Sequence, residues 1–291
     1  MRGQIYKALS GFYYVHTGDQ LYQTRARGNF RQKKSSPLVG DWVEFESTND
    51  KEGMILNIEP RRNVLKRPNV ANVDQVIIVS SLVEPQFSSL LLDRFIVQAE
   101  QLQVRILLYW TKWDLVDDND RETILKEKEQ YERLGYPVFL GEKGQVPPAL
   151  LPYFKDQLTV VMGQSGVGKS TLLNALNPEL QLETNDISEA LGRGRHTTRH
   201  IELWPLHQGL IVDTPGFSSL EFDTLTVPEL ADDFVEFRQW RSQCKFRECT
   251  HDHEPKCRVK EAVDAGEISN ERYQHYLMLK EEIQNRKPNY R

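Results

Sequence analysis

The chain has 291 residues and a formal net charge of −5, which is more chain than one hydrophobic core usually fills. Its composition is 39% hydrophobic, 10% aromatic and 27% charged, which excludes collagen-like, mucin-like and wholly disordered proteins. No apolar run approaches the length of a bilayer span, and the first residues lack the apolar core of a signal peptide, so we expect a cytoplasmic protein with no membrane partner.

Positive charge is concentrated near the start of the chain. The first 70 residues carry 12 Lys+Arg against 7 Asp+Glu. Five of these cations follow one another with no acid between them and with Phe30 among them: Arg25, Arg27, Arg31, Lys33 and Lys34. This pattern suits phosphate backbones and stacked bases, although a solvated basic loop has the same composition.

Three patterns of apolar and polar residues follow one another along the chain. Short alternating runs predict a small β-barrel with strands at 4–9, 12–17, 21–27, 41–46 and 54–59. A linker rich in proline and arginine is expected at 60–68. Apolar strands then alternate with helices, which predicts an α/β domain with strands at 73–82, 104–110, 136–140, 158–162 and 210–212 and helices at 90–102, 121–134 and 170–176. Helices at 227–241 and 270–286 flank a Cys/His cluster. We therefore expect three domains, at 1–67, 68–224 and 225–291.

A phosphate-binding motif follows the strand at 158–162 and precedes a helix, which is the context that a P-loop requires. Its glycines let successive backbone N–H groups face the phosphates, Lys169 neutralises their oxygens, and the Ser170 hydroxyl is suited to Mg²⁺. The motif and the residue after it are Gly163, Gln164, Ser165, Gly166, Val167, Gly168, Lys169, Ser170 and Thr171.

Two further motifs close predicted strands of the same sheet. The D-x-x-G motif at Asp213 and Gly216 places a carboxylate near the Mg²⁺ shell and an N–H group near a γ-phosphate. The other motif is Thr111, Lys112, Trp113 and Asp114. A fixed carboxylate at Asp114 accepts hydrogen bonds from both guanine N1–H and N2–H₂, a donor pair that adenine lacks, so it selects GTP over ATP.

The order of these motifs is unusual, because the base-reading segment precedes the P-loop, whereas in Ras-like GTPases it follows. With the barrel, the Gly192–Thr198 run and the Cys/His cluster, essentially the whole chain resembles the RsgA family of circularly permuted GTPases. This resemblance implies an amino-terminal OB-fold barrel, a permuted α/β GTPase domain and a carboxy-terminal helical zinc-binding domain. It also implies hydrolysis of GTP to GDP and phosphate, late maturation of the small ribosomal subunit, stimulation by that subunit, contact with its rRNA and a monomeric state.

Departures from common GTPase patterns bear on single residues. Phe217 stands where Ras-like enzymes have the glutamine that orients the attacking water, and the resemblance implies that His196 replaces it. It also implies that Thr197 or Thr198 ligates Mg²⁺, without deciding which. A basic loop that only touches RNA is the alternative for this segment. Thr111 replaces the usual asparagine, and the 141–144 loop, Gly-Glu-Lys-Gly, leaves the residue that backs the guanine unassigned.

Three thiolates and one imidazole form a set suited to structural Zn²⁺, since four protein ligands leave no open position for catalysis. They are Cys244, Cys249, His251 and Cys257, and His253 is a rival imidazole. Three unligated thiols in a helical linker are the alternative.

Two other function classes stay open besides the GTPase. One is an RNA-binding scaffold that uses GTP as a structural ligand. The other is a P-loop kinase for a small metabolite, which the lack of an obvious phosphoacceptor pocket disfavours.

Overall fold

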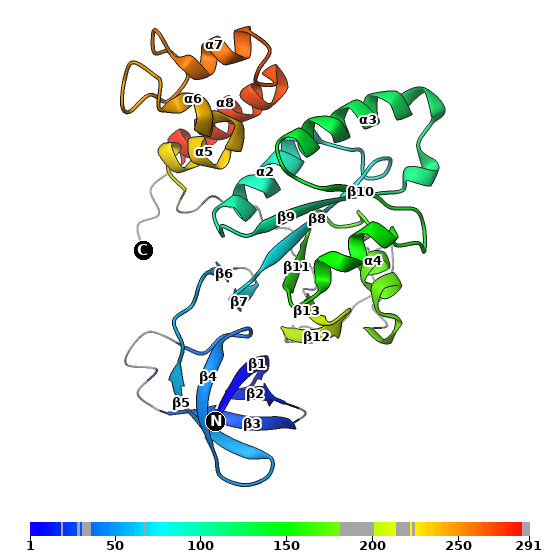
Figure 1. Cartoon of the computed structure of the whole chain (residues 1–291), viewed down its shortest axis with the longest axis vertical. Coiled ribbons are helices and arrows are strands. Elements are labelled where there is room, and N and C mark those ends of the chain that lie inside the picture. Colours follow the sequence, from blue (N-terminus) through cyan, green and yellow to red (C-terminus); the bar gives the residue numbers. More distant parts are fainter. Residues whose placement is uncertain are drawn as a thin grey trace. The chain divides into compact units, whose positions relative to one another are not determined.

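The computed structural model describes residues 1–18, 20–27, 30, 36–66, 68–180, 201–213, 222 and 225–286, with Asp213 described by its backbone only. The chain forms two compact units (Figure 1). The first contains Met1–Gln86, Leu102–Asp117 and Val138–Ser218, and the second contains Phe87–Gln101, Asp118–Pro137 and Ser219–Arg291. The three-domain division stays a prediction. None of the helices described is both long and apolar enough to span a membrane.

Five strands of the first unit close into a barrel, as predicted. They are β1 (Arg2–Leu9), β2 (Phe12–Thr17), β3 (Gln20–Ala26), β4 (Trp42–Ser47) and β5 (Glu52–Ile58). The ladder runs β1-β2-β3-β5-β4 and returns to β1 through the pairing of β4 with β1. Ile5, Val15, Val43, Phe45 and Ile55 are each at most 1% exposed and fill its interior. Closure removes the free sheet edges.

The expected linker contains structure. Strands β6 (Val64–Lys66) and β7 (Asn69–Ala71) pair as an antiparallel hairpin, and Val39 forms a bridge with Val70. The linker expected at 60–68 therefore contains a short strand that the sequence did not predict.

A mostly parallel sheet forms the rest of the first unit. Its order is β10 (Val138–Leu140), β9 (Arg105–Thr111), β8 (Gln75–Ser81), β11 (Leu158–Met162), β13 (Gly209–Asp213) and β12 (Glu202–Leu206). The first five strands are parallel, and β12 is antiparallel to β13. Residues from α4 (Lys169–Leu176) and from η2 (Pro148–Phe154) share a core with the apolar strands. The carboxyl ends of the five parallel strands therefore lie at one edge of the sheet.

The second unit joins two helices from the middle of the chain to the carboxy-terminal helices. Its elements are α2 (Ser89–Glu100), α3 (Asp118–Arg133), α5 (Val227–Asp233), η4 (Val235–Phe237), α6 (Arg238–Arg241), α7 (Arg258–Asp264) and α8 (Asn270–Asn285). The single helix expected at 227–241 is interrupted at Phe234, whose ψ of 89° leaves the helical region. The interruption lets Phe234 and Phe237 both be fully buried, so burial outweighs helix continuity.

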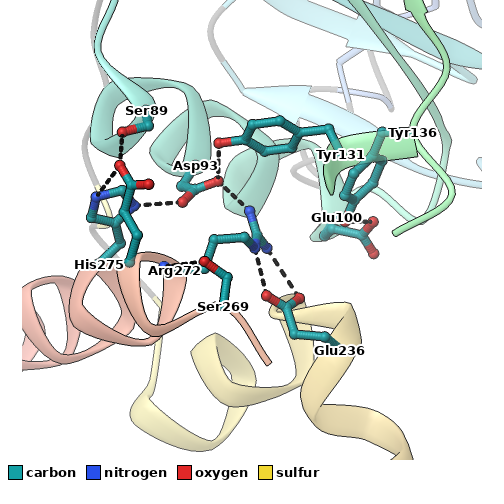
Figure 2. Close-up of polar contacts among 10 residues, drawn as sticks. Ser89, Asp93, Glu100, Tyr131, Tyr136, Glu236, Ser269, Arg272 and His275 are labelled. Atoms are coloured by element: carbon teal, nitrogen blue, oxygen red, sulfur yellow. Dashed lines mark hydrogen bonds and ion pairs between the residues drawn. The ribbon is translucent and has the colours of Figure 1, made fainter. Parts of the chain in front are cut away.

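A buried cluster of charged groups holds these helices together (Figure 2). The Arg272 guanidinium of α8 donates to Asp93 of α2 and to both carboxylate oxygens of Glu236 in η4. Tyr131 of α3 donates to Asp93 Oδ1 at 3.0 Å, and His275 Nδ1 lies 2.6 Å from Asp93 Oδ2. Burial opposes the charge of Arg272, but Asp93 and Glu236 outweigh burial and raise the pKa of Arg272 well above its ordinary value.

Candidate functional site

Three of the motifs found in the sequence meet at the carboxyl edge of the parallel sheet. The P-loop follows β11, Thr111 ends β9, and the backbone of Asp213 ends β13. Strand β11 lies between β8 and β13, with β9 beyond β8, so the four strands place these segments side by side. Loops at this edge are where ligands bind in open α/β sheets.

The P-loop backbone has the shape that its glycines allow. Gly163 has φ of 145°, and a Cβ there would lie 2.2 Å from the carbonyl oxygen of Val79. Gly168, with φ of 98°, caps the start of α4 in the left-handed region. Only glycine adopts the first of these conformations without a steric clash. The loop therefore lies against β8 and passes directly into α4.

Lys169 is folded back over this loop. Its Nζ donates to the carbonyl oxygens of Gly163 at 2.9 Å and Gln164 at 2.6 Å. Burial lowers the pKa of Lys169 to about 8. The ammonium is thus held inside the loop, where phosphate oxygens can replace the two carbonyl acceptors.

Thr111 fastens the base-reading segment to the P-loop. Its buried hydroxyl donates to the Val167 carbonyl oxygen at 2.7 Å. Lys112 follows in the left-handed conformation, with φ of 64°, and its ammonium donates to the Glu84 carbonyl. The hydroxyl of Thr111, which stands in place of the usual asparagine, thus joins β9 to the loop after β11.

Asp114 lies on the short helix η1 (Trp113–Leu115) with its side chain exposed. Within the described part of the chain, its carboxylate has no hydrogen-bond or ion-pair partner. The loop at 141–144 is anchored to the segment that carries Asp114 through Trp113, whose backbone N–H donates to the Gly141 carbonyl oxygen at 3.1 Å. A Cβ at Gly141 would lie 2.2 Å from the Tyr109 hydroxyl oxygen, so this position requires glycine. The loop that the sequence left unassigned thus lies beside the Asp114 segment.

Several predicted residues lie outside the described part of the chain. They are His196, Thr197, Thr198, Gly216 and Phe217, the basic residues Arg193, Arg195 and Arg199, and Arg31, Lys33 and Lys34 of the amino-terminal run. Of that run, Arg25, Arg27 and Phe30 are described, and the Arg25 guanidinium lies 4.5 Å from the Phe12 ring centroid.

The four predicted metal ligands converge in the second unit. The ligand atoms of Cys244, Cys249, His251 and Cys257 all lie within 4.8 Å of one another. His251 Nδ1 is 3.4 Å from Cys257 Sγ and 3.7 Å from Cys244 Sγ. The rival His253 is 94% exposed in its side chain and is not in this cluster.

Aromatic side chains of the buried core hold the backbone and the imidazole ring of the Cys/His cluster in place. Tyr273 donates to the His251 carbonyl oxygen at 2.7 Å, and Tyr276 donates to the Thr250 carbonyl oxygen at 2.6 Å. The ring of Phe237 meets the His251 ring edge to face at 5.7 Å. Three sulfurs and one imidazole nitrogen at this spacing fit tetrahedral Zn²⁺.

Comparisons with known proteins agree with this architecture. The model of the RsgA N-terminal domain matches residues 2–55, and the model of the RsgA GTPase matches residues 58–223. The small ribosomal subunit biogenesis GTPase RsgA of Enterococcus faecalis is 53% identical over 100% of this chain and 98% of that protein. Its namesake in Bacillus subtilis is 51% identical over 99% of both chains.

Solved structures give the same picture. The crystal structure of YloQ, described as a circularly permuted GTPase, is 45% identical, with a TM-score of 0.85 over 99% of this chain and 96% of that one. YjeQ from Thermotoga maritima is 35% identical, with a TM-score of 0.86 over 98% of this chain and 99% of that one.

Fold and motif order together define the class of this protein. A P-loop after β11 and a base-reading segment after β9, earlier in the chain, make it a circularly permuted GTPase. Family models and full-length relatives narrow the class further: the chain belongs to the RsgA family.

Proposed function

We propose that this protein binds the small ribosomal subunit and hydrolyses GTP to GDP and phosphate during maturation of that subunit. The observation that carries the GTPase assignment is the Thr111–Val167 hydrogen bond, which joins the base-reading segment to the P-loop at one edge of the sheet. The subunit assignment is supported by the names of the relatives that match the chain over its full length.

We assign roles to the residues from their motifs. Backbone N–H groups of the P-loop and Lys169 hold the phosphates, Ser170 holds Mg²⁺ with Thr197 or Thr198, and Asp114 reads the guanine. The charge of the phosphates would be partly neutralised by the Mg²⁺ that these residues hold. We assign Asp213 to the Mg²⁺ shell, Gly216 to the γ-phosphate and His196 to the attacking water.

The surroundings of the site complete the proposal. We assign the barrel at 1–67 to rRNA contact, the segment 68–224 to the GTPase domain and 225–291 to a zinc-binding module, in a cytoplasmic monomer. The experiment that tests the function measures GTP turnover with and without purified small subunits. Stimulation by the subunits is expected. Turnover that stays negligible with subunits present would favour an RNA-binding scaffold that uses GTP only as a ligand.

Asp114 gives a test of nucleotide choice. We expect Asp114→Asn to weaken GDP binding by roughly 10²-fold or more and to shift preference toward xanthosine diphosphate, whose C2 oxygen accepts from the new amide. Titration with fluorescent nucleotides measures both affinities, and Asp117→Asn is a nearby control. Equal affinity of the unmodified protein for ATP and GTP would contradict the guanine assignment.

Lys169 gives a pH dependence with a defined sign. Its pKa near 8 in the free protein means that the amine loses its proton as pH rises through that value. A bound phosphate favours the charged amine, so GDP affinity should fall above pH 8 by up to about tenfold per pH unit. Isothermal titration in buffers of different ionisation heat should show proton uptake at pH 8.5. In Lys169→Arg, whose side chain stays charged, this pH dependence should disappear, and its persistence would assign it to another group.

The thiolate cluster predicts a structural metal. About one Zn²⁺ per chain should copurify, and Cys249→Ala should lose it and loosen the carboxy-terminal helices, since metal binding and folding are coupled in small modules. His253→Ala is the matched control and should retain the metal, because that ring lies outside the cluster. A full equivalent of zinc in Cys249→Ala would contradict this ligand set.

A further inference from the structure

The loop between the first two predicted metal ligands carries an exposed aromatic side chain. Phe246 is 43% exposed and lies outside the apolar core of the second unit, in which Phe234, Phe237 and Tyr276 are buried. A single exposed apolar residue is ordinary in a folded protein, so its exposure decides nothing by itself. The charged residues near Phe246 distinguish it from an ordinary exposed side chain.

One cation lies close to this ring, a second follows it in the sequence, and a third lies on the adjacent loop. The Lys245 ammonium lies 5.2 Å from the Phe246 ring centroid. The Lys245 backbone N–H donates to the Lys256 carbonyl oxygen at 3.4 Å, which places the second loop beside the first. Lys245, Arg247 and Lys256 are all exposed. We call Lys245, Phe246, Arg247 and Lys256 the cysteine-loop patch.

The cations of the patch differ from the other cations of this module. Among the described residues, no carboxylate forms an ion pair with Lys245, Arg247 or Lys256. Other cations near the cluster are paired within the module: Arg241 with Asp232, Arg258 with Glu261, and Lys280 with Asp252. The exposed cations that have no carboxylate partner among the described residues therefore lie on the two loops that meet at Phe246.

The acids of the same segment are mostly turned inward. Asp252 accepts from Lys280 at 2.8 Å. Glu254 accepts from the backbone N–H of Thr250 at 2.7 Å and of Asp252 at 3.0 Å. Glu248 is the acid of this segment that stays exposed. The exposed residues of these loops thus include three cations and one carboxylate, together with one aromatic ring.

We infer that the cysteine-loop patch binds unpaired RNA nucleotides, with a base stacked on Phe246 and phosphates held by Lys245, Arg247 and Lys256. An aromatic face among cations matches the two chemical parts of a single strand, the base plane and the phosphate. A duplex hides its base planes and offers the ring no partner. The inference rests on the proposed function, because it names the part of the small subunit that this module recognises.

The test uses the full-length protein and a fluorescent 12-nucleotide oligouridine, with affinity measured by anisotropy. Phe246→Ala and Phe246→Leu should weaken binding by about 5- to 150-fold, which is the usual range for loss of one stacked base. Phe246→Trp should bind at least as tightly as the unmodified protein. Zinc content of each variant shows that the module is intact.

Salt dependence tests the phosphate contacts separately. The triple variant Lys245→Gln, Arg247→Gln, Lys256→Gln should reduce the slope of log affinity against log salt by about 2, since each single-strand phosphate contact contributes about 0.7. Arg258→Gln is the matched control, because that cation is paired with Glu261 in the same module, and its slope should stay unchanged.

Four results would overturn the inference. The first is an oligouridine affinity in Phe246→Ala equal to that of the unmodified protein, and the second is an unchanged salt slope in the triple variant. The third is small-subunit binding that Phe246→Leu retains and Phe246→Ala loses, which would indicate a protein partner. The fourth is unchanged small-subunit binding in all of these variants. If these variants bind small subunits as the unmodified protein does and their turnover is still stimulated, the inference fails and the proposed function stands. If the unmodified protein is not stimulated by small subunits, the proposed function fails first.

Discussion

His196→Ala is expected to keep GTP binding and small-subunit binding while losing about 10² to 10⁴ of the subunit-stimulated rate, the usual contribution of a positioned general base. Phe217 cannot orient water, and the loop with His196 is rich in glycine and arginine, so the free protein should turn over slowly and the subunit should accelerate it. Single-turnover hydrolysis at saturating GTP and subunit measures this rate.

Lys169→Ala is the contrasting variant, because it removes a ground-state phosphate contact and should weaken nucleotide binding itself. The pair separates a residue that acts on the water from one that holds the nucleotide. Full stimulated activity in His196→Ala would show that another group orients the water, with Arg195, Thr198 or a ribosomal group next in line.

Arg272→Met should destabilise the second unit by about 3 to 5 kcal/mol, since it leaves the carboxylates of Asp93 and Glu236 buried without their cation. Native-state hydrogen exchange of amides in α2 and α8 is the measurement, because the chain has two units and its overall unfolding is not one transition.

Matched variants separate charge from packing in this cluster. Arg133→Ala removes an exposed pair with Glu129 on α3 and should change protection by less than about 0.5 kcal/mol. Adding Asp93→Asn and Glu236→Gln to Arg272→Met removes the uncompensated charges and should recover part of the loss. A cost below about 1 kcal/mol for Arg272→Met alone would show that water reaches the cluster.

Much of the fold follows from local pattern. The strand Leu158–Met162 has the predicted bounds, because an apolar run bounded by Gly163 is unambiguous. The three-residue strands β6 and β7 are too short to show alternation, so the sequence did not predict either of them. The break at Phe234 escaped prediction for a different reason, since burial of two rings in a tertiary core overrides a helical sequence pattern.

Some features of the candidate site could likewise be predicted from the sequence, and others depend on the fold. The P-loop, the base-reading segment and the Cys/His cluster are recognisable because residue type and spacing carry their chemistry. The Thr111 hydroxyl bond to Val167 joins residues 56 positions apart, and the need for glycine at Gly141 comes from the Tyr109 ring beneath it. Both depend on neighbouring strands. His251 and His253 differ by two positions in sequence, and only the fold separates a clustered ring from an exposed one.

The cluster around Arg272 has a consequence for how the chain is made. Asp93 and Arg272 are 179 residues apart, and synthesis at roughly 5 to 20 residues per second separates their emergence by about 10 to 35 seconds. Throughout that interval α2 lacks its cation, and the buried ring of Tyr276, which shares a core with Val97 of α2, is synthesised later still. We therefore expect α2 to gain part of its packing only after α8 has been synthesised, which makes the second unit the last to complete its fold.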